Sequence, residues 1–116
     1  NDLHNGPALI DRIRAVVHRH APGASVEGTV FGEAFLTQPG ELSGVIADAI
    51  EARLGIRPEL STTGGTSDAR FLCKLCPVVE FGLLNATMHK LDEAVAVRDL
   101  HALVDIYADI LARICD

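Results

Sequence analysis

A polar, glycine-containing stretch at residues 61–68 is the first place where this chain could do chemistry. It reads Ser-Thr-Thr-Gly-Gly-Thr-Ser-Asp and holds no large apolar residue, so it predicts a surface loop that leads into a helix beginning near Ser67. Two adjacent glycines let a backbone approach a ligand closely, and the free N–H groups at a helix start favour an anion such as a carboxylate. The competing interpretation is a tight turn in which Thr66 caps the following helix.

His89 is the second candidate, because it lies in a short polar loop with Asn85, Thr87 and Lys90 between two apolar segments. A neutral imidazole is a common metal ligand, and the Asn85 amide could hold a substrate. Zinc requires three or four ligands, and no second histidine lies close in the sequence. Spacing alone therefore leaves His89 open between a metal ligand and an ordinary surface histidine.

Cys73 and Cys76 have the CxxC spacing of redox and zinc motifs. No second pair completes a zinc site. A redox pair normally lies at a helix N-terminus, where the thiolate is stabilised, whereas these two lie towards the C-terminal end of the helix predicted from Ser67. We interpret them as semi-buried core thiols. Cys115 makes the number of cysteines odd, which argues against a secreted disulfide framework and favours a reduced, cytoplasmic location.

Composition sets the outer limits on fold and partners. At 116 residues the chain is long enough for one domain. Its net charge of −6 argues against nucleic acid or an anionic membrane as the main partner. No apolar run approaches the ~18 residues of a membrane-spanning helix. The chain begins with Asn-Asp-Leu-His rather than Met, and we expect it to be a fragment or a processed product.

The elements that must position these residues follow from apolar periodicity. A 3.6-residue repeat predicts helices from Pro7 to His20, over 42–50 with Gly55 just beyond the end, and over 97–114. Alternating or continuous apolar residues predict strands at 25–31 and 77–82. This alternation of helices and strands is typical of an α/β fold, with helices covering a sheet.

Three stretches together carry a resemblance to a known family: Thr62–Phe71, Val79–Gly82 and Asn85–Glu93. They resemble the C-terminal part of the succinyl-diaminopimelate desuccinylases, which are dinuclear-zinc amidohydrolases related to acetylornithine deacetylase and exopeptidases. Gly32–Thr37 is similar to the segment that joins the family's lid to its catalytic domain. The resemblance implies that residues 1–36 are half of an α+β lid (dimerisation) domain and that residues 37–116 are the C-terminal part of a zinc-exopeptidase-like catalytic domain.

The same resemblance implies roles for individual residues. His89 matches the last histidine ligand of the zinc pair, Gly65 and Thr66 match the loop that binds the substrate carboxylate, and Asn85 matches a substrate-contacting asparagine. The family's remaining metal ligands and its catalytic residues are expected before Asn1, so none is assigned within this chain. Ala69 departs from the family's usual glycine. The CxxC pair is not a family feature.

The activity implied is hydrolysis of N-succinyl-LL-2,6-diaminopimelate to succinate and LL-2,6-diaminopimelate, a step of lysine and diaminopimelate biosynthesis. The cofactor implied is a pair of zinc ions in each full-length subunit, with cobalt as a substitute. We expect the partners to be a small-molecule dicarboxylate amide and a second subunit, with no nucleic acid and no membrane. We expect this chain alone to be inactive and to bind no zinc tightly. Acetylornithine deacetylase or a related metallo-aminoacylase or carboxypeptidase stays open as an alternative, as does a non-catalytic interaction module that keeps the fold.

Overall fold

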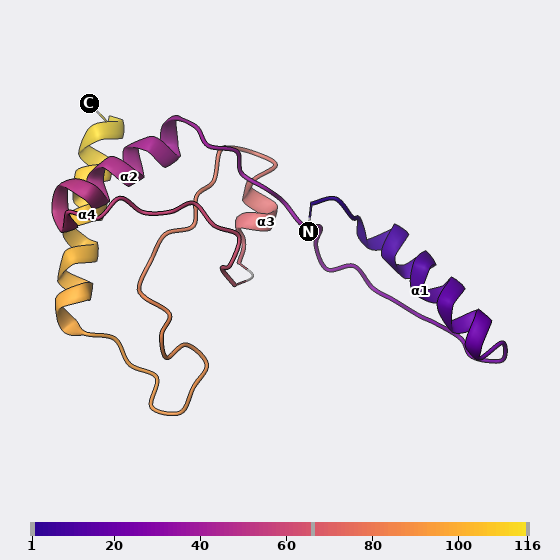
Figure 1. The fold of residues 1–116 in the computed structure, drawn as a ribbon. Coiled ribbons are helices and arrows are strands. Elements are labelled where there is room, and N and C mark those ends of the chain that lie inside the picture. Colours follow the sequence, from indigo (N-terminus) through magenta and orange to yellow (C-terminus); the bar gives the residue numbers. More distant parts are fainter. Residues whose placement is uncertain (1, 66, 116) are drawn as a thin grey trace. The chain divides into compact units, whose positions relative to one another are not determined.

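A computed structural model describes residues 2–65 and 67–115 of the chain, with four helices in those ranges (Figure 1). The described residues divide into two compact units. The first contains the residues up to Thr37 together with Gly65–Val78, and the second contains Gln38–Gly64 together with the residues from Val79 onwards. We describe each unit by itself. None of the helices in the described ranges is long and apolar enough to cross a membrane.

Helix α1, Gly6–His20, begins as the sequence predicts. The Asn5 side chain accepts a hydrogen bond from the Ala8 N–H at 2.9 Å, which satisfies one of the donors that a helix start leaves unpaired. Pro7 lies in the first turn, where its missing N–H costs nothing. The helix ends before Pro22 and Gly23. The predicted helix is therefore confirmed, and Asn5 adds a cap that the periodicity did not indicate.

The segment after α1 turns back and runs beside the helix (Figure 1). Arg14 Nε donates to the Val26 carbonyl at 3.3 Å. The Ile10 side chain lies over the Cα of Gly28, and the Val30 side chain lies over the Cα of Gly6. Alternate residues of 25–31 thus face α1, which is the period predicted for a strand. We call residues 24–33 the return segment.

The predicted strands themselves are absent from the described residues. Both 25–31 and 77–82 are irregular chain, because a strand needs a hydrogen-bonded neighbour and neither segment has a ladder partner in the ranges 2–65 and 67–115. The expected α/β layering is therefore not confirmed, and the described chain consists of helices and irregular segments.

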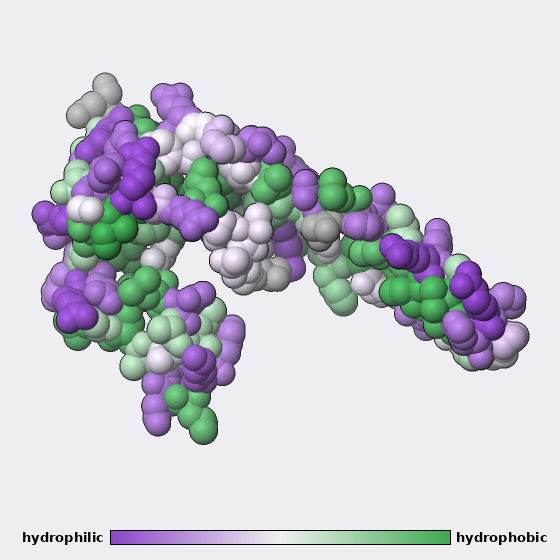
Figure 2. Space-filling view, in the orientation of Figure 1, coloured by the Kyte–Doolittle hydropathy of each residue, from purple (hydrophilic) through white to green (hydrophobic). Residues whose placement is uncertain are grey.

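No residue of α1 is buried. The expected apolar stripe is present, but Leu9, Ile13 and Val16 are about half exposed, and Figure 2 shows hydrophobic side chains at the surface along this helix. His20, which lies on the apolar stripe of the predicted helix and was therefore expected to be partly buried, is also exposed. A single return segment covers only one side of a helix, which leaves the rest of the apolar face uncovered.

Helix α3, Ala69–Leu72, is one turn long, although the sequence predicted a helix from about Ser67 to Cys76. Residues 73–76 continue as hydrogen-bonded turns, and Pro77 then ends the helical path because it has no N–H. The Thr37 hydroxyl donates to the Val78 carbonyl at 2.8 Å. This bond joins the two chain segments that make up the first unit.

The second unit is built on helix α2, Glu41–Leu54. The hydroxyl of the buried Ser43 accepts from the Gly40 N–H at 2.9 Å and donates to the Gly40 carbonyl at 2.8 Å, which fixes the start of the helix. Gly55 ends it in the left-handed conformation, with φ of 67°. This is the role predicted for Gly55, because a residue without a Cβ adopts that conformation without strain.

Helix α4, Val97–Cys115, packs against α2. Their core consists of Ala49 and Ile50 from α2 and Ile106 and Ile110 from α4, with Val45, Ile46 and Phe81 packed against it. The sequence predicted a helix over 97–114 with an apolar stripe of Val97, Leu100, Leu103, Val104, Tyr107, Ile110, Leu111 and Ile114. The bounds of α4 match that prediction to within one residue, and the stripe is right at Ile110, which is buried, but not throughout. Ile106 lies outside the predicted stripe and is 2% exposed, whereas Leu111 lies within it and is 59% exposed.

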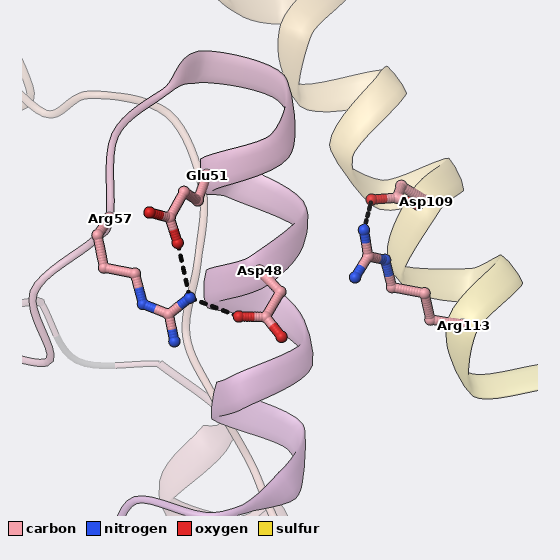
Figure 3. A network of polar contacts seen from close by, with 5 residues as sticks. All are labelled: Asp48, Glu51, Arg57, Asp109 and Arg113. Carbon is pink, nitrogen blue, oxygen red and sulfur yellow. Dashed lines mark hydrogen bonds and ion pairs between the residues drawn. The ribbon is translucent and has the colours of Figure 1, made fainter.

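Ion pairs border this core (Figure 3). Arg53 of α2 pairs with Asp105 of α4. Arg57 pairs with Asp48 and with Glu51, the latter at 2.8 Å, and these hydrogen bonds raise the pKa of the Arg57 guanidinium. Arg113 and Asp109 make an i,i+4 pair at 2.9 Å within α4. The side chains of these pairs are each more than a third exposed, so the pairs add little to stability.

Candidate functional site

The loop from Asn85 to Ala94, which contains the candidate ligand His89, is closed on itself by a threonine. Thr87 Oγ1 donates to the Ala94 carbonyl at 2.7 Å and accepts from the Ala94 N–H at 3.0 Å. Inside this closure, the Met88 N–H donates to the Asn85 carbonyl and the Lys90 N–H donates to the Thr87 carbonyl. The loop therefore has an internal framework, even though most of its side chains face solvent.

His89 has a left-handed backbone, with φ of 60°, and Asp92 does too, with φ of 56°. In the described chain these are the only residues other than glycine with positive φ. The conformation costs about 1–3 kcal/mol for such residues, and it is concentrated at functional sites. The Glu93 carboxylate accepts the His89 N–H at 3.3 Å. The surrounding hydrogen bonds thus hold His89 in a backbone that it would not adopt alone.

Helix α4 fixes both ends of this loop. Before the loop, the Tyr107 hydroxyl donates to the Phe81 carbonyl at 2.7 Å, and the two rings are tilted at a centroid distance of 5.8 Å. After the loop, the Asp99 N–H donates to the Ala96 carbonyl at the start of the helix. The loop is therefore anchored at both ends to the helix that forms the core with α2, which is how a rigid scaffold positions a functional loop.

The His89 side chain is exposed, and within the described residues its ring makes no hydrogen bond or ion pair. An imidazole in that state is available as a metal ligand. Zinc needs at least three protein ligands, and residues 2–65 and 67–115 contain no group of three His, Cys, Asp or Glu side chains that could hold an ion. The exposed imidazole of His89 can supply one ligand of such a set.

The glycine loop is also at the surface. A Cβ built on Gly64 or Gly65 would meet nothing within 4 Å, so the space beside this backbone is open. The Ser67 hydroxyl accepts a hydrogen bond from the Ala69 N–H at 3.0 Å. Ser67 thus makes a capping bond of the kind that the sequence predicted for Thr66. Thr66 itself lies outside the described residues.

The structure places the predicted site residues in two locations. Asn85 and His89 lie four residues apart in one hydrogen-bonded loop of the second unit, and Gly65 belongs to the first unit. Sequence reasoning missed the closure by Thr87 and the bond from Glu93. A hydroxyl within a run of turn residues is a typical side-chain-to-backbone hydrogen-bonding pattern, and that signal could have indicated Thr87. No sequence pattern indicates a positive φ at His89.

Comparison with known protein families identifies the family to which this chain belongs. A family model described as peptidase family M20/M25/M40 matches residues 2–113 of the chain. The chain belongs to peptidase family M20/M25/M40. This result confirms the family resemblance carried by the glycine loop and the Asn85–Glu93 stretch. Because the match extends over both compact units, the M20/M25/M40 assignment applies to α1 and the return segment as well as to α2 and α4.

Three proteins that are similar to this chain carry the same name. A succinyl-diaminopimelate desuccinylase of Rhizorhabdus wittichii is 61% identical over 114 residues, which is 98% of this chain and 30% of that protein. One from Sphingopyxis alaskensis is also 61% identical, with the same coverage. A third, from Novosphingobium aromaticivorans, is 57% identical over 92% of this chain and 28% of its own length. The chain thus spans about 30% of the length of these relatives.

Proposed function

We propose that this chain is the C-terminal part of a succinyl-diaminopimelate desuccinylase, an amide hydrolase that releases succinate and LL-2,6-diaminopimelate from the N-succinylated diamino acid. The relatives that carry this name match 92–98% of the chain at 57–61% identity. The observation that carries the proposal is the strained, exposed His89 in a loop that is hydrogen-bonded on itself. No feature of the described residues favours an acetylated substrate or a non-catalytic role.

His89 is proposed to hold one ion of a zinc pair, with cobalt as a substitute. The bound metal, when present, lowers the pKa of a water molecule and polarises the amide carbonyl. The other ligands and the catalytic carboxylates are assigned outside this chain. Within it, Glu93 and Thr87 position His89 through its backbone, and the ring remains free to reach an ion.

The substrate is proposed to contact the chain at two places. The backbone N–H of Gly65, a residue with open space at its Cβ position, and the hydroxyl of Thr66 suit a carboxylate, and the Asn85 amide both donates and accepts hydrogen bonds. We keep the division into a partial lid domain over 1–36 and a catalytic portion over 37–116 as part of the proposal, together with assembly into a homodimer or larger oligomer.

Replacement of His89 in the full-length enzyme tests this proposal. Removing residues that only orient a metal ligand typically costs about 10–100-fold in metal affinity or activity, so we expect His89→Ala to lower turnover by at least about 100-fold. Zinc content measured by elemental analysis should fall in the same variant. Thr66→Ala should weaken substrate binding and leave the zinc content unchanged.

Two further variants control for structural damage. His89→Asn keeps a residue that tolerates a left-handed backbone but removes the imidazole, so it should lose metal and activity as His89→Ala does. His101→Ala removes another exposed histidine, on α4, and should change neither. Full zinc content and turnover in His89→Asn would show that His89 is not a ligand.

A further inference from the structure

The CxxC cysteines, which the proposed function does not use, lie one helical turn apart in a tightened turn. The Lys74 N–H donates to the Phe71 carbonyl and the Leu75 N–H donates to the Leu72 carbonyl, both with three-residue spacing. The Cys76 N–H also donates to the Leu72 carbonyl, with the four-residue spacing of an α-helix, so the turn mixes the two patterns, and residues three apart share a face in both. Cys73 has φ of −58° and ψ of −15°, which is close to a 3₁₀ conformation. Residues three apart are eclipsed in a 3₁₀ turn. Cys73 and Cys76 therefore lie on the same side of the chain.

This turn needs only a small adjustment to close a disulfide. Side chains three residues apart in a helix have Cβ atoms about 5–6 Å apart, and a disulfide needs about 3.5–4.5 Å. The turn lies at the end of the helical path, and Pro77 follows it without an N–H to disturb. A movement of about 1–2 Å would close that gap. It would disturb the bonds that the Cys73 and Cys76 thiols donate to backbone carbonyls and the Cys76 N–H bond to the Leu72 carbonyl.

Both thiols border an open cavity. About 440 Å³ in volume, it is lined by residues 35–37 on one side and by residues 73–78 on the other, all within the first unit. Such a volume is in the range that holds a small molecule. Cys73 is half-buried and Cys76 is exposed, so the structure corrects the expectation that both are core thiols. A small reagent can reach Cys76 from solvent and Cys73 from the cavity.

Two other uses of the pair are less well supported. A zinc site needs further ligands, and no group of three potential ligands exists in the part of the chain that the structure describes. An oxidising dithiol of the kind found at helix N-termini depends on a stabilised thiolate, which favours the reduced form. Cys73 and Cys76 instead follow a four-residue helix at its C-terminal end, so no helix N-terminus stabilises their reduced form.

We propose that Cys73 and Cys76 form a reversible intramolecular disulfide by exchange with a small-molecule disulfide such as glutathione disulfide. One protein thiolate attacks the reagent and releases one thiol, which leaves a mixed disulfide. The second protein thiolate then attacks the bound protein sulfur and releases the second thiol. Two protein thiols are oxidised and one reagent disulfide is reduced to two thiols, so electrons and protons balance. This site is independent of the proposed hydrolytic function.

Tryptic mass mapping of the full-length protein tests the proposal directly. Lys74 lies between the two cysteines, so trypsin separates them into peptides 71–74 and 75–90. After equilibration with glutathione disulfide, we expect these peptides to remain linked, with a combined mass about 2 Da below their sum. Dithiothreitol should separate them. Cys115 should give only a glutathione adduct, because it has no neighbouring cysteine in the described chain.

Single substitutions distinguish a reaction that needs both cysteines from a reaction of either cysteine alone. Cys73→Ser and Cys76→Ser should each accumulate a glutathione adduct on the remaining cysteine, since the second exchange step has no thiol to complete it. The wild-type protein should show little of that adduct. Separate adducts on Cys73 and Cys76 in the wild type, a link to Cys115, or no reaction at either thiol would each overturn the proposal.

Discussion

Helices α2 and α4 pack against each other, whereas α1 packs against the return segment. Both pairs contain amphipathic helices with correctly predicted starts and ends, yet only the α2–α4 pair has a core. Ile50, Ile106 and Ile110 are buried between α2 and α4, whereas α1 has no buried residue. The return segment contacts α1 through Val26, Gly28 and Val30, and these are too few to cover its apolar face. An amphipathic pattern therefore indicates that a face will pack, but not what it packs against.

Within the second unit, helices α2 and α4 differ in a similar way from the loop that contains His89. The helices there have ordinary backbones and carry the buried apolar side chains. The loop over 85–94 has exposed side chains and the left-handed residues His89 and Asp92. Its conformation depends on hydrogen bonds that α4 and Thr87 supply. The buried apolar side chains and the strained backbone thus lie in adjacent but distinct parts of one unit. This is expected where a functional loop is attached to a rigid scaffold.

The largest effect should come from the core. Ile106→Ala should lower the free energy of unfolding by about 2–5 kcal/mol, because it removes a buried side chain and leaves a cavity. Leu111→Ala, on the same helix but largely exposed, should cost less than about 1 kcal/mol. Urea denaturation followed by circular dichroism measures both. Equal losses in the two variants would mean that the buried face of α4 is assigned wrongly.

An intermediate effect should come from the loop closure. Thr87→Val keeps the side-chain shape and removes both hydrogen bonds to Ala94, at about 0.5–1.5 kcal/mol each, which gives about 1–3 kcal/mol in total. Amide hydrogen exchange at Ala94 should become faster because its N–H loses its acceptor. Thr87→Ser retains the hydroxyl and serves as the control. Unchanged exchange in Thr87→Val would contradict the closure.

The smallest effect should come from the cap of α1. Asn5→Ala should cost about 0.5–2 kcal/mol, since the Ala8 N–H loses its acceptor. Asn5→Asp keeps an acceptor oxygen and should cost less. Because α1 has no buried residue, we expect the loss to appear as faster amide exchange within α1 and not in α2 or α4. Equally faster exchange in all three helices would show that the two units unfold together.

The sequence predicted the boundaries of α1, α2 and α4 well, but not those of α3, because the determinants of the first three are local. Pro7 and Gly55 act through their own backbone preferences, so their roles could be predicted without knowledge of the fold. The buried face of α4 was predicted only in part, since Ile110 belongs to the predicted stripe and Ile106 does not. Ile106 is buried because of where α2 lies, and a helix with apolar residues on several sides offers more than one face for packing.

The candidate site, too, could be predicted from the sequence only in part. The types and spacing of Asn85 and His89 indicated a polar loop and left the role of His89 open. Its role as a metal ligand came from the family resemblance and stays a prediction. The positive φ at His89 and the bond from Glu93 are outcomes of the loop as a whole, so no single residue indicated them. The CxxC pair was misjudged for a related reason. Its exposure depends on how α3 ends, and the predicted longer helix would have placed it differently.

The contacts between α1 and the return segment fix their alignment to the residue. Val30 lies where Gly6 has no side chain, and Ile10 lies where Gly28 has none; a Cβ on either glycine would come within 2.9 Å of its neighbour. A slip of one residue would present Glu27 and Thr29 to the helix in place of Gly28 and Val30, and would reverse every inward and outward side chain of the segment. Two residues without side chains thus accommodate the side chains of Val30 and Ile10, and a side chain added at Gly6 or Gly28 would have to displace its neighbour.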